Sequence, residues 1–194
     1  MDIRQAIRDY RPYNEQEAAD RALILDFLAK NPDAFSRANR VAHMTASAWV
    51  VNPARDRVLM VYHRIYDSWS WTGGHADGDE DLAGVALREV REETGVKSAR
   101  LLSDEIFSLE ALTVDGHEKR GAYVSSHLHL NVTYLLEADD REELTVCEAE
   151  NSGVRWFTLD GALEASSEPW FVQRIYRKLN EKLKQSACVS SVSS

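Results

Sequence analysis

Several features that mark common classes of protein are scarce or missing in this sequence. It has two cysteines in 194 residues, Cys147 and Cys188, which are too few for a disulfide scaffold and too far apart for a structural zinc site. No run of residues approaches the roughly 20 apolar residues that a membrane span requires, and the charged N-terminus lacks the apolar stretch of a secretory signal. We therefore expect a soluble protein with reduced thiols, a cytoplasmic location and no membrane partner.

Positive charge is also scarce. The chain has 23 Lys and Arg residues against 32 Asp and Glu residues, and its formal net charge at pH 7 is -9. Proteins that bind nucleic acid usually do so through a basic surface that neutralises phosphates, so no nucleic-acid binding is predicted. With 44% hydrophobic residues, the chain is long enough to bury one substantial core.

Hydrophobic periodicity predicts helices near both ends of the chain and strands between them. Apolar residues at helical spacing predict a helix over residues 15–29, which Pro32 ends, and an amphipathic helix over residues 169–184. Strands are predicted as a hairpin over residues 42–63, near residues 68–72, once or twice within residues 99–112, over residues 127–138 and over residues 153–159, with a polar turn at residues 115–121. Strands interrupted by a helix in mid-chain indicate an α/β protein with a mixed sheet and helices on both faces.

The segment over residues 71–96 concentrates negative charge after two glycines. It holds seven acidic side chains, and its glycines, Gly73 and Gly74, allow a tight turn and a close approach of the backbone to other groups. A helix is predicted from about residue 80, which at about 100° per residue places Glu89, Glu92 and Glu93 on one face. These carboxylates repel one another unless a cation lies among them, and oxygen ligands favour Mg²⁺. The alternative is an ordinary solvated face of a helix.

An arginine accompanies the carboxylates. Arg88 precedes Glu92 by four residues, a spacing at which an ion pair on an exposed helix contributes about 0.2–0.5 kcal/mol. Such a contact is too weak to matter for stability. We therefore expect Arg88 to orient the Glu92 carboxylate.

The same segment resembles the signature of the Nudix hydrolases at every specified position. That signature reads Gly, five residues, Glu, seven residues, Arg-Glu, an aliphatic residue, one residue, Glu-Glu, one residue, Gly and an aliphatic residue. The matching residues are Gly74, Glu80, Arg88, Glu89, Val90, Glu92, Glu93, Gly95 and Val96. The resemblance implies the Nudix fold, an α/β/α sandwich with a mixed β-sheet, over residues 41–185. Residues 1–40 are then an N-terminal helical extension and residues 186–194 a flexible tail.

The resemblance also implies an activity and a set of site residues. The family hydrolyses the diphosphate linkage of a nucleoside diphosphate linked to a group X, or a nucleoside triphosphate, by attack of water at phosphorus with Mg²⁺, for which Mn²⁺ can substitute. By similarity, the metal ligands would be Glu89, Glu92, Glu93 and the carbonyl of Gly73, whereas Glu80 and Arg88 would brace the loop and the helix. These three glutamates, Arg88 and a general base form the expected catalytic set. Relatives carry such a base before a late strand, where this chain has Glu150; Glu148 and a surface carboxylate without a role are the alternatives.

A further group of polar and aromatic residues is predicted to include contacts with the substrate, which would be a small-molecule nucleotide. Aromatic faces can stack on a base and imidazoles can donate to phosphate or sugar oxygens, whereas packing in the core is the alternative for each. The candidates are His43, Ser47, Trp49, Trp71, His127 and His129. A competing hypothesis assigns His127 and His129 to a zinc site, for which His117 would have to approach as the third ligand.

Two questions stay open at this level. One alternative function is a Nudix-fold sensor that binds a nucleotide without turnover, although the intact Glu-x-x-Glu-Glu core over residues 89–93 favours the enzyme. The apolar stripe of the N-terminal extension could form a homodimer interface or a lid, or could pack on its own domain. The sequence selects no substrate.

Overall fold

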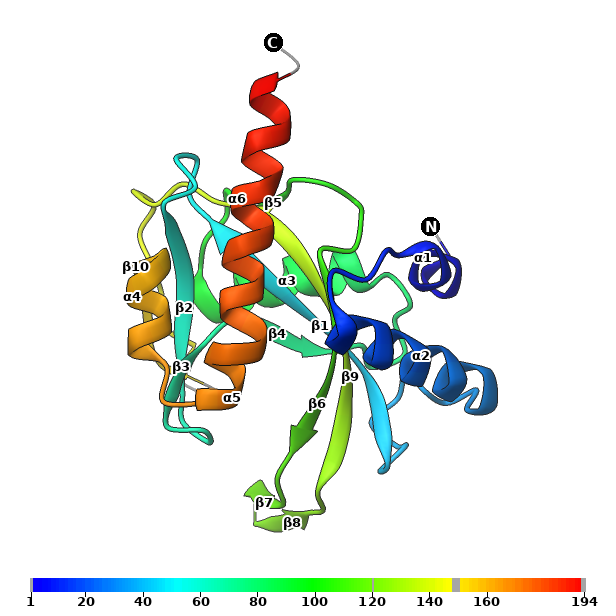
Figure 1. The fold of residues 1–194 in the computed structure, drawn as a ribbon. Helices are drawn as coiled ribbons and strands as arrows, with labels where there is room; N and C mark the ends of the chain where they lie inside the picture. The colour runs from blue at the N-terminus through cyan, green and yellow to red at the C-terminus, as the bar shows by residue number, and fades with distance from the viewer. Residues whose placement is uncertain (1, 120, 148–150, 193–194) are drawn as a thin grey trace. The chain divides into compact units, whose positions relative to one another are not determined.

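A computed structural model describes residues 2–119, 121–147 and 151–192, and Figure 1 labels their helices and strands. The chain forms two compact units. Unit 1 comprises Met1–Ala48, Gly73–Glu89 and Leu101–Leu135, and unit 2 comprises Trp49–Thr72, Val90–Arg100 and Leu136–Ser194. Because strand β1 (Ala42–Val51) and helix α3 (Leu82–Thr94) continue from one unit into the other, each contributes residues to both.

The N-terminal part of unit 1 consists of two capped helices. Helix α1 (Ile3–Asp9) follows Asp2, whose side chain accepts a hydrogen bond from the backbone N–H of Arg4. Helix α2 (Glu15–Lys30) follows Asn14, whose side chain caps the helix in the same way. The sequence-based helix over residues 15–29 is therefore confirmed, whereas α1, which is seven residues long, was not predicted.

Helix α2 is joined to strand β6 (Ser108–Val114) through its side chains. Gln16 Nε2 donates to the carbonyl oxygen of Leu109 at 3.2 Å. Two residues further along the strand, the backbone N–H of Ala111 donates to Asp20 Oδ2 at 3.0 Å. Because these two backbone groups point to the same edge of β6, the side chains of α2 take the place of a neighbouring strand there.

The strands of unit 1 pair around β9 (His127–Glu137). Strand β6 runs antiparallel to β9, with a register from Ser108↔Thr133 to Val114↔His127. Strands β1 and β5 (Arg100–Leu101) are also neighbours of β9, and β4 (Thr72–His75) pairs with β1. The polar turn predicted at residues 115–121 is wrong in part, because His117–Lys119 form strand β7, which pairs with β8 (Ala122–Val124) in an antiparallel ribbon. Polar side chains fit such a ribbon because it is largely exposed to solvent.

Unit 2 pairs its strands around β2 (Arg57–His63). The end of β1 is antiparallel to β2 at Val51↔Val58, which confirms the predicted hairpin. Strands β3 (Ser68–Ser70) and β10 (Asn151–Thr158) are also antiparallel to β2. The C-terminal helices are α4 (Leu159–Ala165), α5 (Pro169–Phe171), the π-helix η1 (Val172–Tyr176) and α6 (Arg177–Val192). The predicted helix over residues 169–184 is thus interrupted by the π-helix η1. It also continues to Val192, into the stretch that was predicted to be a flexible tail.

Helix α3 interrupts the strands in mid-chain as the sequence predicts, and the fold class is α/β. The burial pattern of β1 differs from a half-exposed strand, because all ten of its residues are buried. Among the helices of the described part of the chain, none combines the length and apolar character needed to cross a membrane.

Candidate active site

The two glycines of the acidic segment allow close approaches at the end of β4. A Cβ added to Gly74 would lie 2.4 Å from the carboxyl carbon of Glu89, and one added to Gly73 would lie 2.5 Å from Ser47 Oγ and 2.7 Å from the carbonyl oxygen of Ala46. Neither glycine has a positive φ. Glycine is therefore required here for space rather than for its conformational freedom.

The acidic helix α3 begins and ends at residues suited to those roles. Asp81 Oδ1 accepts from the backbone N–H of Gly84 at 3.1 Å, which caps the first turn. Gly95, with a φ of 74°, donates its backbone N–H to the carbonyl of Arg91 at 3.0 Å and ends the helix. The sequence placed the start near residue 80, and the helix begins at Leu82.

In unit 1, the Glu89 carboxylate lies over the glycine backbone and beside the guanidinium group of Arg88. Its side chain is 15% exposed, and Arg88 Nη2 approaches Glu89 Oε1 at 3.5 Å. Arg88 Nη1 also lies 3.8 Å from Asp79 Oδ2. The spacing predicts that Arg88 pairs with Glu92, but its ion pairs are with Glu89 and Asp79. The reason is that a helical side chain leans toward the helix N-terminus, where Asp79 lies.

In unit 2, the same helix carries a buried and an exposed carboxylate. Glu93 is 4% exposed, and Asn151 Nδ2 at the start of β10 donates to Glu93 Oε1 at 3.2 Å. Glu92 is exposed. The amide orients one oxygen of Glu93 without neutralising its charge. Carboxylate oxygens are ligands that hard divalent cations prefer, so the glutamates of α3 are candidate metal ligands.

The predicted brace, Glu80, has a partner that sequence reasoning missed. Arg4 Nη1 of helix α1 lies 2.7 Å from Glu80 Oε2 at the edge of a surface hollow of about 430 Å³. Because the Glu80 side chain is 54% exposed, solvent screens the pair, which is of the class worth about 0–1 kcal/mol. The predicted general base, Glu150, and its alternative, Glu148, lie outside the described residues.

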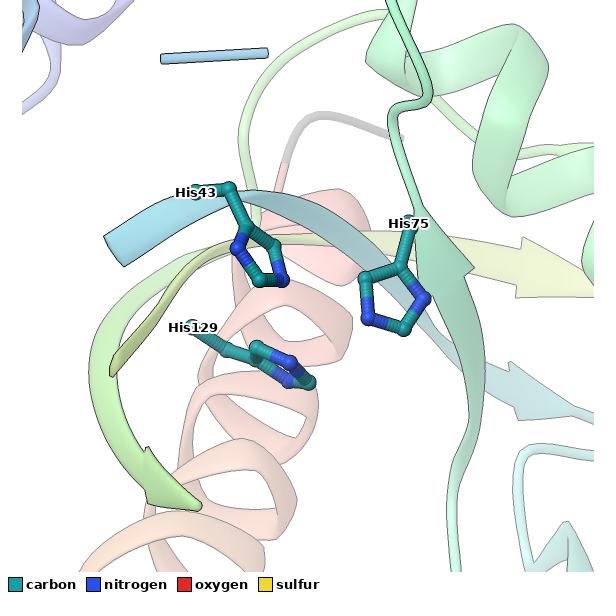
Figure 2. A group of neighbouring side chains, drawn as sticks. All are labelled: His43, His75 and His129. Carbon is teal, nitrogen blue, oxygen red and sulfur yellow. The ribbon is translucent and has the colours of Figure 1, made fainter. Parts of the chain in front are cut away.

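Four histidines of unit 1 gather on three strands, and we call them the histidine cluster: His43 on β1, His75 on β4, and His127 and His129 on β9. The ring centroids of His43 lie 5.1 Å from His75 and 5.0 Å from both His127 and His129. Figure 2 shows the rings of His43, His75 and His129 turned toward a common space, and their candidate ligand nitrogens all lie within 4.8 Å of one another. His75 was not predicted as a site residue.

Burial keeps two members of the cluster neutral. It is the main cause that lowers the pKa of His43. Burial, followed by the charges of neighbouring histidines with His75 first, lowers the pKa of His129 to about 2. Both imidazoles are thus uncharged at neutral pH, when each has one nitrogen that donates and one that accepts.

Ser47 belongs to a buried polar network next to the histidine cluster on β1. Its Oγ donates to Asn131 Oδ1 at 2.9 Å, and Asn131 Nδ2 donates to Glu110 Oε2 at 3.0 Å. Ser108 Oγ connects this network to helix α2, because it donates to the buried Glu17 at 2.8 Å. Sequence reasoning missed this network because its members lie far apart along the chain.

The two predicted tryptophans lie in an aromatic cluster of unit 2. Trp49 is fully buried and stacks on Tyr176 with a centroid distance of 5.4 Å. Trp71 is 8% exposed and meets the rings of Tyr176 and Phe171 edge to face.

Comparisons with known proteins agree with the acidic signature. The NUDIX domain model matches residues 41–179. The chain is 33% identical over 123 residues to a CMP-5'-(N-acetyl-N-hydroxy-3-aminopropyl)phosphonate hydrolase of Streptomyces rubellomurinus, covering 61% of this chain and 53% of the relative. It is 29% identical over 126 residues to nucleoside diphosphate-linked moiety X motif 6 of Mus musculus, covering 63% of this chain and 37% of that relative. It is 42% identical over 55 residues to the chloroplastic Nudix hydrolase 27 of Arabidopsis thaliana, covering 28% and 24%. The matches thus span about a quarter to a half of these relatives.

Solved structures share the fold. A NUDIX family hydrolase from Clostridium perfringens matches with a TM-score of 0.53 and 21% identity, over 76% of this chain and 98% of that one. The NUDIX domain of Shewanella oneidensis NrtR, crystallised with ADP ribose, matches with a TM-score of 0.52 and 20% identity, over 81% and 97%. At these identities, the likeness concerns the fold alone.

Proposed function

This chain belongs to the NUDIX family, and we propose that it is a Mg²⁺-dependent hydrolase that cleaves the diphosphate linkage of a nucleotide. The substrate class is a nucleoside diphosphate linked to a group X, or a nucleoside triphosphate, and Mn²⁺ would substitute for Mg²⁺. The observation that carries the proposal is the close approach of the Glu89 carboxylate to Gly74, where an added Cβ would lie 2.4 Å from the carboxyl carbon. This contact joins the glycine turn to the helix that also carries Glu92 and Glu93.

Each acidic residue of α3 has a proposed role. Glu89, Glu92 and Glu93 would hold the cation together with the carbonyl oxygen of Gly73. Arg88, which contacts Glu89 and Asp79, would keep the Glu89 carboxylate in place. Asn151 would do the same for the buried Glu93. A bound divalent cation lowers the pKa of water and shields phosphate charge, which is the chemistry that hydrolysis of a diphosphate needs.

The general base is proposed from its place in the sequence. Glu150 directly precedes Asn151, and Asn151 hydrogen-bonds with the metal-site residue Glu93. Glu148 is the alternative. A base would take a proton from the attacking water, so its loss should lower kcat more than substrate affinity. The substrate contacts proposed for His43, Ser47, Trp49, Trp71, His127 and His129 stay predictions.

The decisive experiment is a turnover assay on a panel of dinucleotides, nucleotide sugars and nucleoside triphosphates with Mg²⁺. Product should form with at least one compound, and excess chelator should abolish it. Glu92→Gln and Glu93→Gln, which remove charge but keep shape, should each lower kcat/KM by about 100-fold or more. Glu105→Gln is the matched control, because Glu105 is an exposed glutamate outside α3.

Two outcomes would contradict this proposal. If Glu93→Gln turned over the best substrate as fast as the parent, the metal assignment would be wrong. If a nucleotide bound tightly and no product formed with any compound, the chain would be a sensor rather than an enzyme. Parent rates for Glu150→Gln would exclude only the proposed base.

The cellular setting forms part of the proposal. We propose a cytoplasmic protein whose partner is a small-molecule nucleotide rather than a nucleic acid or a membrane. Residues 1–40 would be an extension of a domain over residues 41–185. A homodimer formed through this extension predicts that light scattering gives twice the mass of the chain.

A further inference from the structure

The histidine cluster holds three imidazoles at a spacing close to that of a metal site. The candidate ligand nitrogens of His43, His75 and His129 all lie within 4.8 Å of one another. Nitrogens bound to one zinc ion at about 2.0–2.1 Å are about 3.4 Å apart, so ring movements of about 1 Å would complete the coordination. The three residues lie on three different strands, β1, β4 and β9, which fix their backbones (Figure 2).

The tautomer of His43 is set by a backbone carbonyl. His43 Nδ1 lies 3.0 Å from the carbonyl oxygen of Asn39, and because that oxygen can only accept, Nδ1 must carry the proton. In the neutral ring, Nε2 then holds the lone pair. Nε2 is buried and has no hydrogen-bond partner among the described residues. Buried polar atoms are normally satisfied, so this nitrogen is one that a ligand would complete.

His127 sets the tautomer of His129 by the same reasoning. His127 Nδ1 lies 2.8 Å from the carbonyl oxygen of Ser125 and therefore donates to it, so that in the neutral ring His127 Nε2 is an acceptor. His129 Nε2 lies 3.2 Å from this acceptor and must supply the proton. The lone pair of His129 is thereby placed on Nδ1. Metal-binding histidines are commonly held in this way, with one ring nitrogen donating to an outer partner and the other left to bind the metal.

We propose that His43, His75 and His129 bind one zinc ion through their imidazoles, a set of ligands that includes none of the carboxylates of α3. Nitrogen donors without carboxylates select zinc and related transition metals over Mg²⁺. Three imidazoles leave a fourth position of a tetrahedral ion open to water or another ligand. His127 does not bind the ion but orients His129. The competing zinc hypothesis from the sequence named His127, His129 and His117, of which His129 alone is retained as a ligand.

The test measures metal binding by the full chain and does not depend on hydrolysis. Protein freed of metal with a chelator is titrated with Zn²⁺ in the presence of excess Mg²⁺. A second titration uses Co²⁺, because its visible spectrum reports four-coordinate nitrogen ligation. One zinc ion should bind per parent chain. His43→Gln, His75→Gln and His129→Gln should each weaken zinc binding at least about tenfold and remove the cobalt spectrum. His117→Gln is the matched control, because His117 is a histidine of the exposed ribbon in the same unit.

A second set of variants guards against misfolding and against binding by the acidic helix. His127→Ala should weaken zinc binding by about 10–100-fold but keep the cobalt spectrum, since only the outer partner is lost. Zinc should raise the thermal midpoint of the parent and of His117→Gln but not of His129→Gln. Glu92→Gln should bind zinc like the parent. Equal zinc affinity in the parent and in the three ligand variants, or loss of binding in Glu92→Gln, would overturn the proposal.

Discussion

Replacing Gly74 by alanine tests whether the Glu89 carboxylate must lie against the glycine backbone. The added Cβ would lie 2.4 Å from the carboxyl carbon of Glu89 and 2.5 Å from its Oε2. Non-bonded carbon atoms lie about 3.5–4.0 Å apart, so the carboxylate must move by about 1 Å or more. Because the contact is with the far end of a flexible side chain, the side chain yields before the backbone does. We therefore expect a misplaced carboxylate in a chain that still folds.

A displacement of about 1 Å in a positioned group lowers the rate by about 100-fold, equivalent to about 2.7 kcal/mol of activation free energy. The assay is kcat/KM for the best nucleotide with Mg²⁺, measured beside thermal unfolding. The Gly74→Ala midpoint should stay within about 2–4 °C of the parent, which corresponds to about 1 kcal/mol for a chain of this size.

Gly78→Ala is the matched control for this experiment. Gly78 has a φ of +93°, and a Cβ there would meet nothing within 4 Å. The substitution strains the backbone by about 1–2 kcal/mol but pushes on no carboxylate, so stability should fall and kcat/KM should not. If Gly74→Ala were as active as the parent, the carboxylate would not need its place against the glycine backbone. The same would follow if kcat/KM fell in proportion to stability in both Gly74→Ala and Gly78→Ala.

Three further predictions concern Gly73, Asn151 and His129. Gly73→Ala should lower the free energy of unfolding by about 1–3 kcal/mol in urea, because its Cβ would meet the Ala46 carbonyl oxygen at 2.7 Å and backbone must move. Asn151→Leu removes the donor to Glu93, so kcat/KM should fall about tenfold at low Mg²⁺ and recover at high Mg²⁺; an equal deficit at both would contradict this role. In metal-free buffer below about pH 6.5, the parent should lose about 1.4 kcal/mol of stability per pH unit, because the unfolded chain protonates His129 whereas the folded chain, with a His129 pKa of about 2, does not. When the free energy of unfolding is measured by urea titration at several pH values, it should depend less on pH in His129→Gln than in the parent.

The acidic helix could be predicted because its information is local. The helical spacing of Glu89, Glu92 and Glu93, the cap at Asp81 and the stop at Gly95 all lie within one short stretch of sequence. The helix starts within two residues of the predicted position. The hairpin of β1 and β2 was predictable for the same reason, since its strands flank one turn.

Contacts between distant segments could not be predicted in this way. His75 reads as a loop residue after two glycines, and it reaches His43 and His129 because β4 pairs with β1 and β1 with β9. Arg88 shows the same limit at shorter range. The turn before α3 contains Asp77 and Gly78 with positive φ, and it brings Asp79 back to Arg88 in a geometry that helical spacing does not contain.

The side chains of α2 that hydrogen-bond to β6 keep other chains from pairing with the edge of that strand. An uncovered outer strand offers its backbone N–H and C=O groups to any other chain, which is a common route to aggregation. Here Gln16 and Asp20 occupy the groups of Leu109 and Ala111 that such a chain would use. A variant that lacks the residues before the NUDIX domain would therefore expose the backbone groups of this strand and be less soluble. This would hold even if catalysis needed none of the removed residues.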